Sequence, residues 1–150
     1  MQIFYQIVLV ISLLFLVTRG QGNPLRQIRQ AIQRSKYKEY ENYIISQMNL
    51  ESGYLTNTLS KKPIYNPFSM GVPRIRKSLR IGEYANPNID GGMEFSVYRN
   101  YTEATEDFII YLDSIRMPLG LDCKEYNKYI SSKGFALDPR YEEKLNNMCK

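Results

Sequence analysis

The chain has 150 residues, enough for about one domain, and a formal net charge of +5 at neutral pH. It contains two cysteines and no histidine, which excludes histidine-based catalytic triads and zinc sites with histidine ligands. We therefore expect no metal and no cofactor, and any chemistry must rest on carboxylates, hydroxyls and amides.

The basic residues are spread along the chain without forming a basic block. This pattern gives no support to a nucleic-acid partner, and we expect none. A mildly basic surface instead suits a polyanionic partner such as cell wall.

The first 20 residues are predicted to be a signal peptide. Residues 7–17 are apolar apart from Ser12; about 11 residues fit the apolar centre of a signal peptide but fall short of a membrane span. Gly20 offers a small residue for cleavage, whereas no Lys or Arg precedes the apolar run, so an uncleaved anchor is the alternative. We expect residues 21–150 to be secreted or periplasmic, without stable membrane insertion after cleavage.

Two helices are predicted next. Apolar residues recur at helical spacing from Leu25 onward, which predicts an amphipathic helix from Pro24 to about Arg34. The same spacing predicts a longer, better buried helix over Tyr37–Leu50, ended by Ser52-Gly53.

A small hairpin is predicted in the middle of the chain. Three prolines between Lys61 and Pro73 indicate an irregular loop. The segments Lys77–Tyr84 and Met93–Arg99 then alternate in polarity, and the turn residues Asn86–Gly92 lie between them.

Helices return in the last third of the chain. Asn100 or Thr102 is expected to cap the first of them, a second covers about Asp122–Ser131, and a last one starts at Asp138-Pro139. Together these elements predict one α+β domain, mostly α, with the hairpin as a small second lobe beside a cleft.

Cys123 and Cys149 both lie near the C-terminus. In an exported chain they are expected to form a disulfide, which would close a loop of 27 residues. In the chain-entropy model, a disulfide that closes a loop of this length stabilises the folded protein by roughly 3–4 kcal/mol. Two free thiols are the alternative.

Glu51 is the first candidate for catalysis. It ends an apolar helix, Gly53 follows at once, and Gln47 and Ile44 share its face. A carboxyl placed there is rigid and partly desolvated, which raises its pKa as a general acid requires. Glycoside cleavage needs such an acid. By pattern alone, an ordinary solvated glutamate is the alternative.

Five stretches in order resemble the bacterial glucosaminidase family of peptidoglycan hydrolases, which includes the flagellar cell-wall hydrolase and many autolysins. The segment QMNLESGY, which contains Glu51, is similar to the family's helix-end motif AQAALESGWG. The other matches are Asn66–Met70 to the NPFGMK loop, Phe95–Tyr98 to the FRxY strand, Asp107-Phe108 to the family's DY or DF, and Gly134–Tyr141 to GYATDPxY.

The resemblance implies a lysozyme-like fold and hydrolysis of the β-1,4 bond after N-acetylglucosamine in peptidoglycan, with Glu51 as proton donor. Glu83 lies where the family often has a Glu on its β-lobe, so it is our first choice for a second carboxylate, with Glu94 as the runner-up. Participation by the substrate's own N-acetyl group is a third option.

The resemblance also implies substrate-binding residues: Tyr54, Asn66, Phe68, Tyr98 and Phe135. Tyr54 replaces the family's Trp and keeps an aromatic face, whereas Phe135 lacks the hydroxyl of the family's Tyr. Plain packing is the alternative for Phe68 and Tyr98.

We expect a monomer whose partner is the glycan strand of peptidoglycan. The missing hydroxyl at Phe135 favours one rival function, a non-catalytic glycan-binding module on the same scaffold. A second rival is an inhibitor or structural protein that keeps only the fold.

Overall fold

The computed structural model describes residues 22–85 and 92–149. The expected signal peptide, residues 1–20, lies outside the described residues, as does most of the expected hairpin turn. The elements in chain order are α2 (Pro24–Gln33), η1 (Lys38–Tyr40), α3 (Glu41–Ser52), β1 (Gly82–Ala85), β2 (Glu94–Val97), α4 (Tyr101–Ser114), α5 (Cys123–Ser132) and α6 (Tyr141–Asn146). The prediction of a mostly helical α+β chain with a small hairpin is confirmed.

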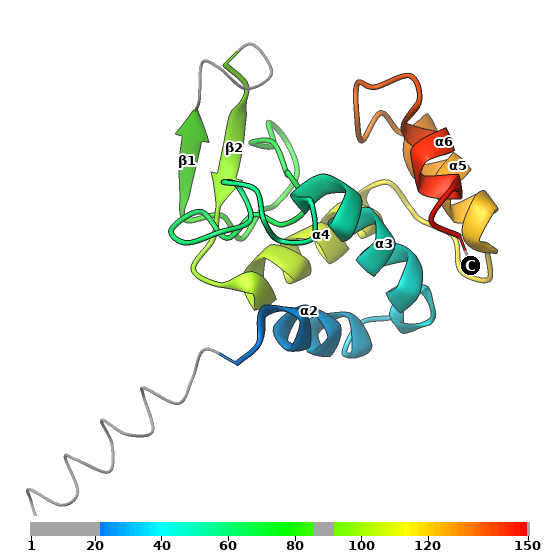
Figure 1. Ribbon diagram of the computed structural model, residues 1–150, viewed down its shortest axis with the longest axis horizontal. Helices are drawn as coiled ribbons and strands as arrows, with labels where there is room; N and C mark the ends of the chain where they lie inside the picture. The colour runs from blue at the N-terminus through cyan, green and yellow to red at the C-terminus, as the bar shows by residue number, and fades with distance from the viewer. Residues whose placement is uncertain (1–21, 86–91, 150) are drawn as a thin grey trace, which may run out of the picture.

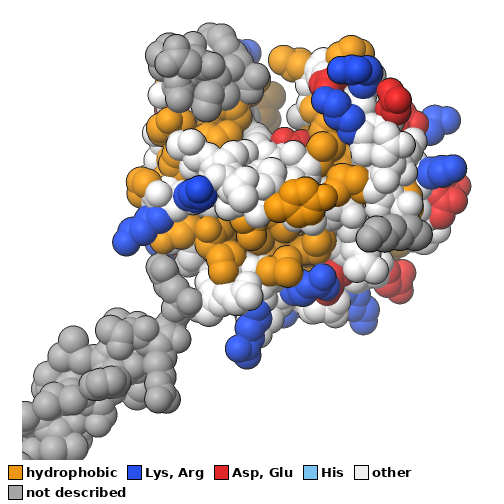
Figure 2. Space-filling view, in the orientation of Figure 1, with side chains coloured by type: hydrophobic (Ala, Val, Ile, Leu, Met, Phe, Trp, Pro, Cys, Tyr) orange, Lys and Arg blue, Asp and Glu red, His pale blue; other side chains and the backbone are white. Residues whose placement is uncertain are grey.

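The elements form two lobes. Figure 1 shows the hairpin of β1 and β2 on one side and α5 with α6 on the other, with α2, α3 and α4 lying below and between them. The surface is hollowed between the two lobes, and acidic atoms lie at the base of this hollow (Figure 2). None of the helices in residues 22–85 and 92–149 combines the length and apolar character that a membrane crossing needs.

One hydrophobic core joins the five α-helices of the described residues. Each helix contributes two buried side chains four positions apart, and this spacing places both on the same helix face. The pairs are Ile28 and Ile32, Ile44 and Met48, Phe108 and Leu112, Tyr126 and Ile130, and Tyr141 and Leu145.

Local polar contacts set the helix ends. Asn23 and Asn100 each accept a backbone hydrogen bond at the start of α2 and α4, as expected for Asn at a helix N-terminus. Asp122 and Glu125 form a reciprocal capping box at the start of α5. Gly53 ends α3 with φ of 55°, a left-handed conformation that favours glycine.

The hairpin is shorter than the sequence pattern predicts. β1 and β2 pair antiparallel, with Tyr84 opposite Phe95 and Glu83 opposite Ser96. The predicted first strand, Lys77–Tyr84, is wrong in its first half: pairing begins only near Ile81, whose N–H donates to the carbonyl of Val97 at 2.8 Å.

Asp107 on α4 explains why the first strand starts late. Its buried carboxylate accepts hydrogen bonds from Arg76 at 2.8 and 3.1 Å, from the backbone N–H of Leu79 at 2.8 Å and from the hydroxyl of Tyr98 at 2.7 Å. The segment before β1 is therefore held against α4 instead of extending the sheet. Asp107 thus ties the hairpin lobe to the helical body.

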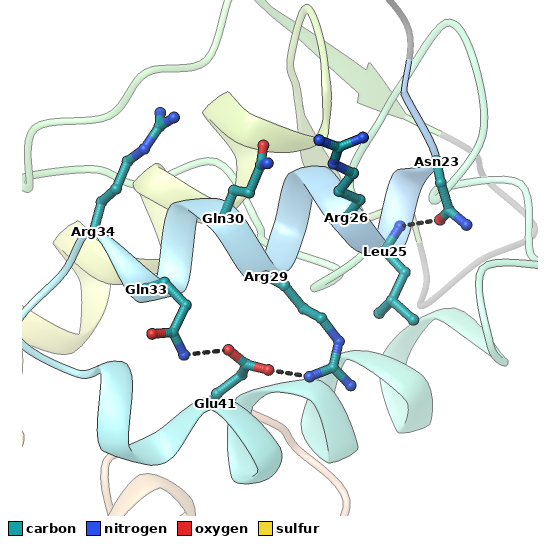
Figure 3. A pocket seen from close by; sticks show the side chains of 8 residues that line it. All are labelled: Asn23, Leu25, Arg26, Arg29, Gln30, Gln33, Arg34 and Glu41. Carbon is teal, nitrogen blue, oxygen red and sulfur yellow. Dashed lines mark hydrogen bonds and ion pairs between the residues drawn. The ribbon is translucent and has the colours of Figure 1, made fainter.

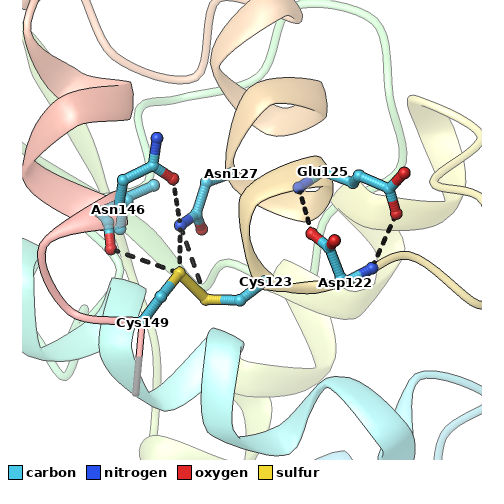
Figure 4. The surroundings of a disulfide bond; sticks show 7 residues. Asp122, Cys123, Glu125, Asn127, Asn146 and Cys149 are labelled. Atoms are coloured by element: carbon cyan, nitrogen blue, oxygen red, sulfur yellow. Dashed lines mark hydrogen bonds between the residues drawn. A yellow bond between two sulfur atoms is a disulfide. The ribbon is translucent and has the colours of Figure 1, made fainter.

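A disulfide ties the C-terminal lobe together. Cys123 at the start of α5 is bonded to Cys149 just after α6 (Figure 4). Beside it, the amide of Asn127 donates to Asn146 at 3.0 Å. These contacts fix α6 against α5, and α6 also packs against α3.

The last helix begins later than predicted. It starts at Tyr141, and Asp138-Pro139 precedes it as a turn. The carboxylate of Asp138 accepts from the N–H of Arg140 at 2.9 Å, and its carbonyl accepts from the N–H of Tyr141 at 3.0 Å. Asp138 therefore caps the turn before the helix and not the helix itself.

Replacing Asp107 by Asn should destabilise the fold and flatten its acid sensitivity. Burial alone would raise the pKa of the Asp107 carboxyl, but the hydrogen bonds from Arg76, Tyr98 and Leu79 outweigh it and lower the pKa. Its stabilisation is therefore present above about pH 4 and lost as the pH falls through the lowered pKa. Urea unfolding at pH 7 should show a loss of about 3–5 kcal/mol, the cost of breaking a buried ion pair.

The matched control is Asp113→Asn, because Asp113 is a half-exposed carboxylate on the same helix. This change should cost less than about 1 kcal/mol. Equal losses for the two variants would contradict the role given to Asp107.

Candidate active site at the end of helix α3

Glu51 lies in the last turn of α3 and is partly exposed. Its backbone carbonyl accepts hydrogen bonds from the amide of Asn57 at 2.8 Å and from the hydroxyl of Ser69 at 3.3 Å. Both donors come from the loop after the helix, so they hold this loop against the helix end. The carboxyl group of Glu51 is therefore carried by a backbone that is fixed on two sides.

The residues after Glu51 adopt an uncommon backbone conformation. Gly53, Tyr54 and Leu55 all have positive φ, between 55° and 65°. A run of this kind is strained for residues other than glycine, and such strain is concentrated at functional sites. The Tyr54 side chain, three residues after Glu51, is 70% exposed. Its aromatic face is therefore open to solvent.

Tyr141 of α6 reaches the carboxyl group of Glu51. Its hydroxyl donates a hydrogen bond of 2.6 Å to Oε1 of Glu51. Burial raises the pKa of the Tyr141 phenol far above its usual range, and the neighbouring negative charge of Glu51 raises it further. The phenol therefore keeps its proton near neutral pH and remains a hydrogen-bond donor.

Two buried side chains, Gln47 and Tyr126, continue the hydrogen bonding from Tyr141 into the protein interior. The amide nitrogen of Gln47 donates to the Tyr141 hydroxyl oxygen at 3.1 Å, and the hydroxyl of Tyr126 donates to the amide oxygen of Gln47 at 3.0 Å. Gln47 and Tyr126 have no exposed surface, and Tyr141 is 5% exposed. A buried polar chain therefore leads from α5 through α3 and α6 to Glu51.

Three of the residues expected to bind substrate are buried. Asn66 bonds with its amide to the carbonyls of Met70 and Ser96 and accepts from the N–H of Met70. Phe68 stacks on Phe108 with ring centres 4.3 Å apart, whereas the Tyr98 hydroxyl is bonded to Asp107. All three have no exposed surface, so in this conformation they support the site from within.

Phe135 lies directly beside the Tyr141 ring. The two rings stack with centres 5.9 Å apart, and Phe135 also packs edge-on against Phe108 and Tyr111. Phe135 brings no hydroxyl to the site, but its ring supports the tyrosine that does.

The two candidates for a second carboxylate lie on the hairpin. Glu83 of β1 is exposed, and its carboxylate is ion-paired with Arg80. Glu94 begins β2 and is also exposed. The face of the hairpin that carries Tyr84 and Phe95 packs on Leu59 and Ile64.

A different hollow, of about 630 Å³, lies along α2 and next to Glu41 at the start of α3 (Figure 3). Arginines and glutamines line it, and its one carboxylate is Glu41, which is ion-paired with Arg29 and accepts from Gln33. Glu41 begins α3, about 15 Å of helix away from Glu51. This hollow suits an anion better than acid catalysis.

The family model for mannosyl-glycoprotein endo-beta-N-acetylglucosaminidase matches residues 27–150. The chain belongs to the glucosaminidase family. No curated protein sequence matches it significantly.

Several solved structures share the lysozyme-like fold of this chain. The glycoside hydrolase domain of FlgJ from Salmonella typhimurium is 25% identical, with a TM-score of 0.57 over 82% of this chain and 79% of that one. The peptidoglycan hydrolase of Sphingomonas sp. A1 is 20% identical, with a TM-score of 0.59 over 83% and 82%. The catalytic domain of the autolysin Auto from Listeria monocytogenes is 22% identical, with a TM-score of 0.51 over 83% and 77%.

The sequence analysis did not identify Tyr141, Gln47 or Tyr126 as parts of the candidate site. Tyr141 was named only as the last residue of the match to GYATDPxY, and Gln47 was expected only to share the face of Glu51. The available signal was Gln47 itself, because a polar side chain on a buried helix face needs hydrogen-bond partners.

Replacing Tyr141 by Phe should destabilise the fold by about 1–3 kcal/mol, because the buried amide of Gln47 loses its acceptor. Thermal and urea unfolding at pH 7 measure the effect. The control is Tyr129→Phe, which removes a hydroxyl on α5 that donates to the carbonyl of Ile115 and should cost no more than about 1 kcal/mol. If Tyr141→Phe leaves the stability unchanged, the stabilising role of the buried hydrogen bonds through Gln47 and Tyr141 is refuted.

Proposed function

We propose that the protein is a secreted or periplasmic glycoside hydrolase that cleaves the β-1,4 bond after N-acetylglucosamine in peptidoglycan, with Glu51 as general acid. Family membership supports a glucosaminidase activity. The names of the Sphingomonas and Listeria structures, a peptidoglycan hydrolase and an autolysin, support the cell-wall substrate. The observation that carries the proposal is the partly exposed carboxyl of Glu51, fixed by the hydroxyl of Tyr141.

The geometry around Glu51 suits proton donation. The carboxyl is partly removed from water, and the leaving sugar oxygen needs a proton as the glycosidic bond breaks. After the proton leaves, the hydrogen bond from Tyr141 stabilises the carboxylate that remains, because bonds donated to a charged group are the stronger ones. Tyr54 offers an exposed aromatic face nearby for stacking against a sugar.

The second catalytic group is proposed to be Glu83, with Glu94 as the runner-up. Glu83 would have to exchange its ion pair with Arg80 for a contact with water or substrate. A carboxyl separation of about 5 Å would indicate a covalent intermediate, and one of about 6.5–9.5 Å an activated water. Participation by the substrate's N-acetyl group would need neither glutamate.

Replacing Glu51 by Gln should lower the rate of wall hydrolysis by about 10²–10⁴-fold, the usual contribution of a general acid. The change keeps the size of the side chain and an oxygen that can accept from Tyr141, so folding should be intact. The measurements are clearing of a cell-wall suspension and release of reducing ends. Glu39→Gln, an exposed glutamate in η1, is the control and should leave both unchanged.

Mass analysis of the reduced fragments identifies the bond. The proposal expects new ends that carry N-acetylglucosamine. Full activity of the Glu51→Gln variant, or new ends that carry only N-acetylmuramic acid, would refute it.

A non-catalytic glycan-binding module is the second candidate, and Phe135 favours it because that position lacks the hydroxyl of the family motif. Such a module would bind cell wall without releasing reducing ends. The same assay therefore separates the two functions.

A further inference from the structure

A one-way chain of hydrogen bonds ends at Glu51. It runs from the Tyr126 hydroxyl to the Gln47 amide oxygen at 3.0 Å, from the Gln47 amide nitrogen to the Tyr141 hydroxyl oxygen at 3.1 Å, and from the Tyr141 hydroxyl to Oε1 of Glu51 at 2.6 Å. The three donors come from different helices, α5, α3 and α6. The chain is therefore a product of the tertiary fold.

The amide of Gln47 gives this chain its direction. An amide has one accepting end and one donating end. Because Tyr126 donates to the oxygen of Gln47, the nitrogen faces Tyr141 and occupies a lone pair of its hydroxyl oxygen. The single hydroxyl proton of Tyr141 is then directed to Glu51.

We propose that Gln47 and Tyr126 are positioning residues that keep Tyr141 a donor to Glu51 and prevent its oxygen from accepting a hydrogen bond from the protonated Glu51 carboxyl. This inference rests on the proposed role of Glu51 as general acid. With Oε1 already receiving the Tyr141 proton, the acid form of Glu51 carries its own proton on Oε2. That proton is then not held in a hydrogen bond back to Tyr141.

Apart from Glu51, the titratable side chains in this hydrogen-bond chain are the phenols of Tyr141 and Tyr126. Burial raises the pKa of each of them. The other groups that act on the Tyr126 phenol are also tyrosines: Tyr111, Tyr40 and Tyr37. Both phenols therefore keep their protons near neutral pH.

The test replaces Gln47 by Met, which keeps a similar volume and removes the amide. The lone pair of Tyr141 is then open to the acid proton of Glu51, and this bond stabilises the protonated form. Activity of a general acid falls as pH rises through its pKa, so the alkaline limb of kcat should move to higher pH. We expect a move of about half to one pH unit, the size of one neutral hydrogen bond.

The plateau of kcat should fall severalfold in the same variant, because part of the acid population now holds its proton against Tyr141. KM should change little, since Gln47 is fully buried. A lower plateau together with a limb at higher pH is a signature that loss of stability alone does not produce.

Tyr126→Phe is the second variant and a milder one, because it removes only a hydroxyl and lets the amide of Gln47 rotate. It should shift the limb in the same direction by a smaller amount. Tyr129→Phe on the same helix is the control and should leave the profile unchanged. Circular dichroism confirms that each variant is folded at the assay temperature.

The proposal is overturned if the alkaline limb of kcat stays at the same pH in both Gln47→Met and Tyr126→Phe while their stability is reduced. These residues would then have a purely structural role. Failure of the proposed function is separate, because it appears as full activity in Glu51→Gln. If Gln47→Met does not fold, the limb of Tyr126→Phe decides the question.

Discussion

The hydrogen bond from Tyr141 to Glu51 is the contact on which the site depends, because it joins residues 90 positions apart in the chain. It forms only if α6 is placed against the end of α3. The disulfide and the bond between Asn127 and Asn146 hold α6 in that place from the side of α5. The disulfide of the C-terminal lobe therefore also supports the position of the Glu51 carboxyl group.

The hairpin lobe is held by a separate set of polar contacts. Asp107 binds the segment before β1, and Asn66 joins the loop after α3 to β2. Ser69 from the same loop bonds to the carbonyl of Glu51. Both lobes are thus attached to the end of α3 by buried or half-buried hydrogen bonds, and Glu51 lies where the two attachments meet.

Much of this arrangement could be predicted from the sequence. The helical spacing from Leu25 onward and the stop at Gly53 are local signals, and the motif around Glu51 carries the family resemblance. The late start of β1 could not be predicted, because Asp107 holds Leu79 across 28 residues of chain. The target of the Tyr141 hydroxyl was equally hidden: periodicity shows that a side chain faces inward but not which polar atom of another helix it meets.

The most direct test of the account follows the carboxyl carbon of Glu51 by carbon-13 NMR as the pH is raised, with the signal assigned by its loss in Glu51→Gln. A general acid must be protonated where the enzyme works. The account predicts that the Glu51 signal titrates with the same midpoint as the alkaline limb of wall hydrolysis. A carboxyl that is already ionised across the whole active range would contradict it.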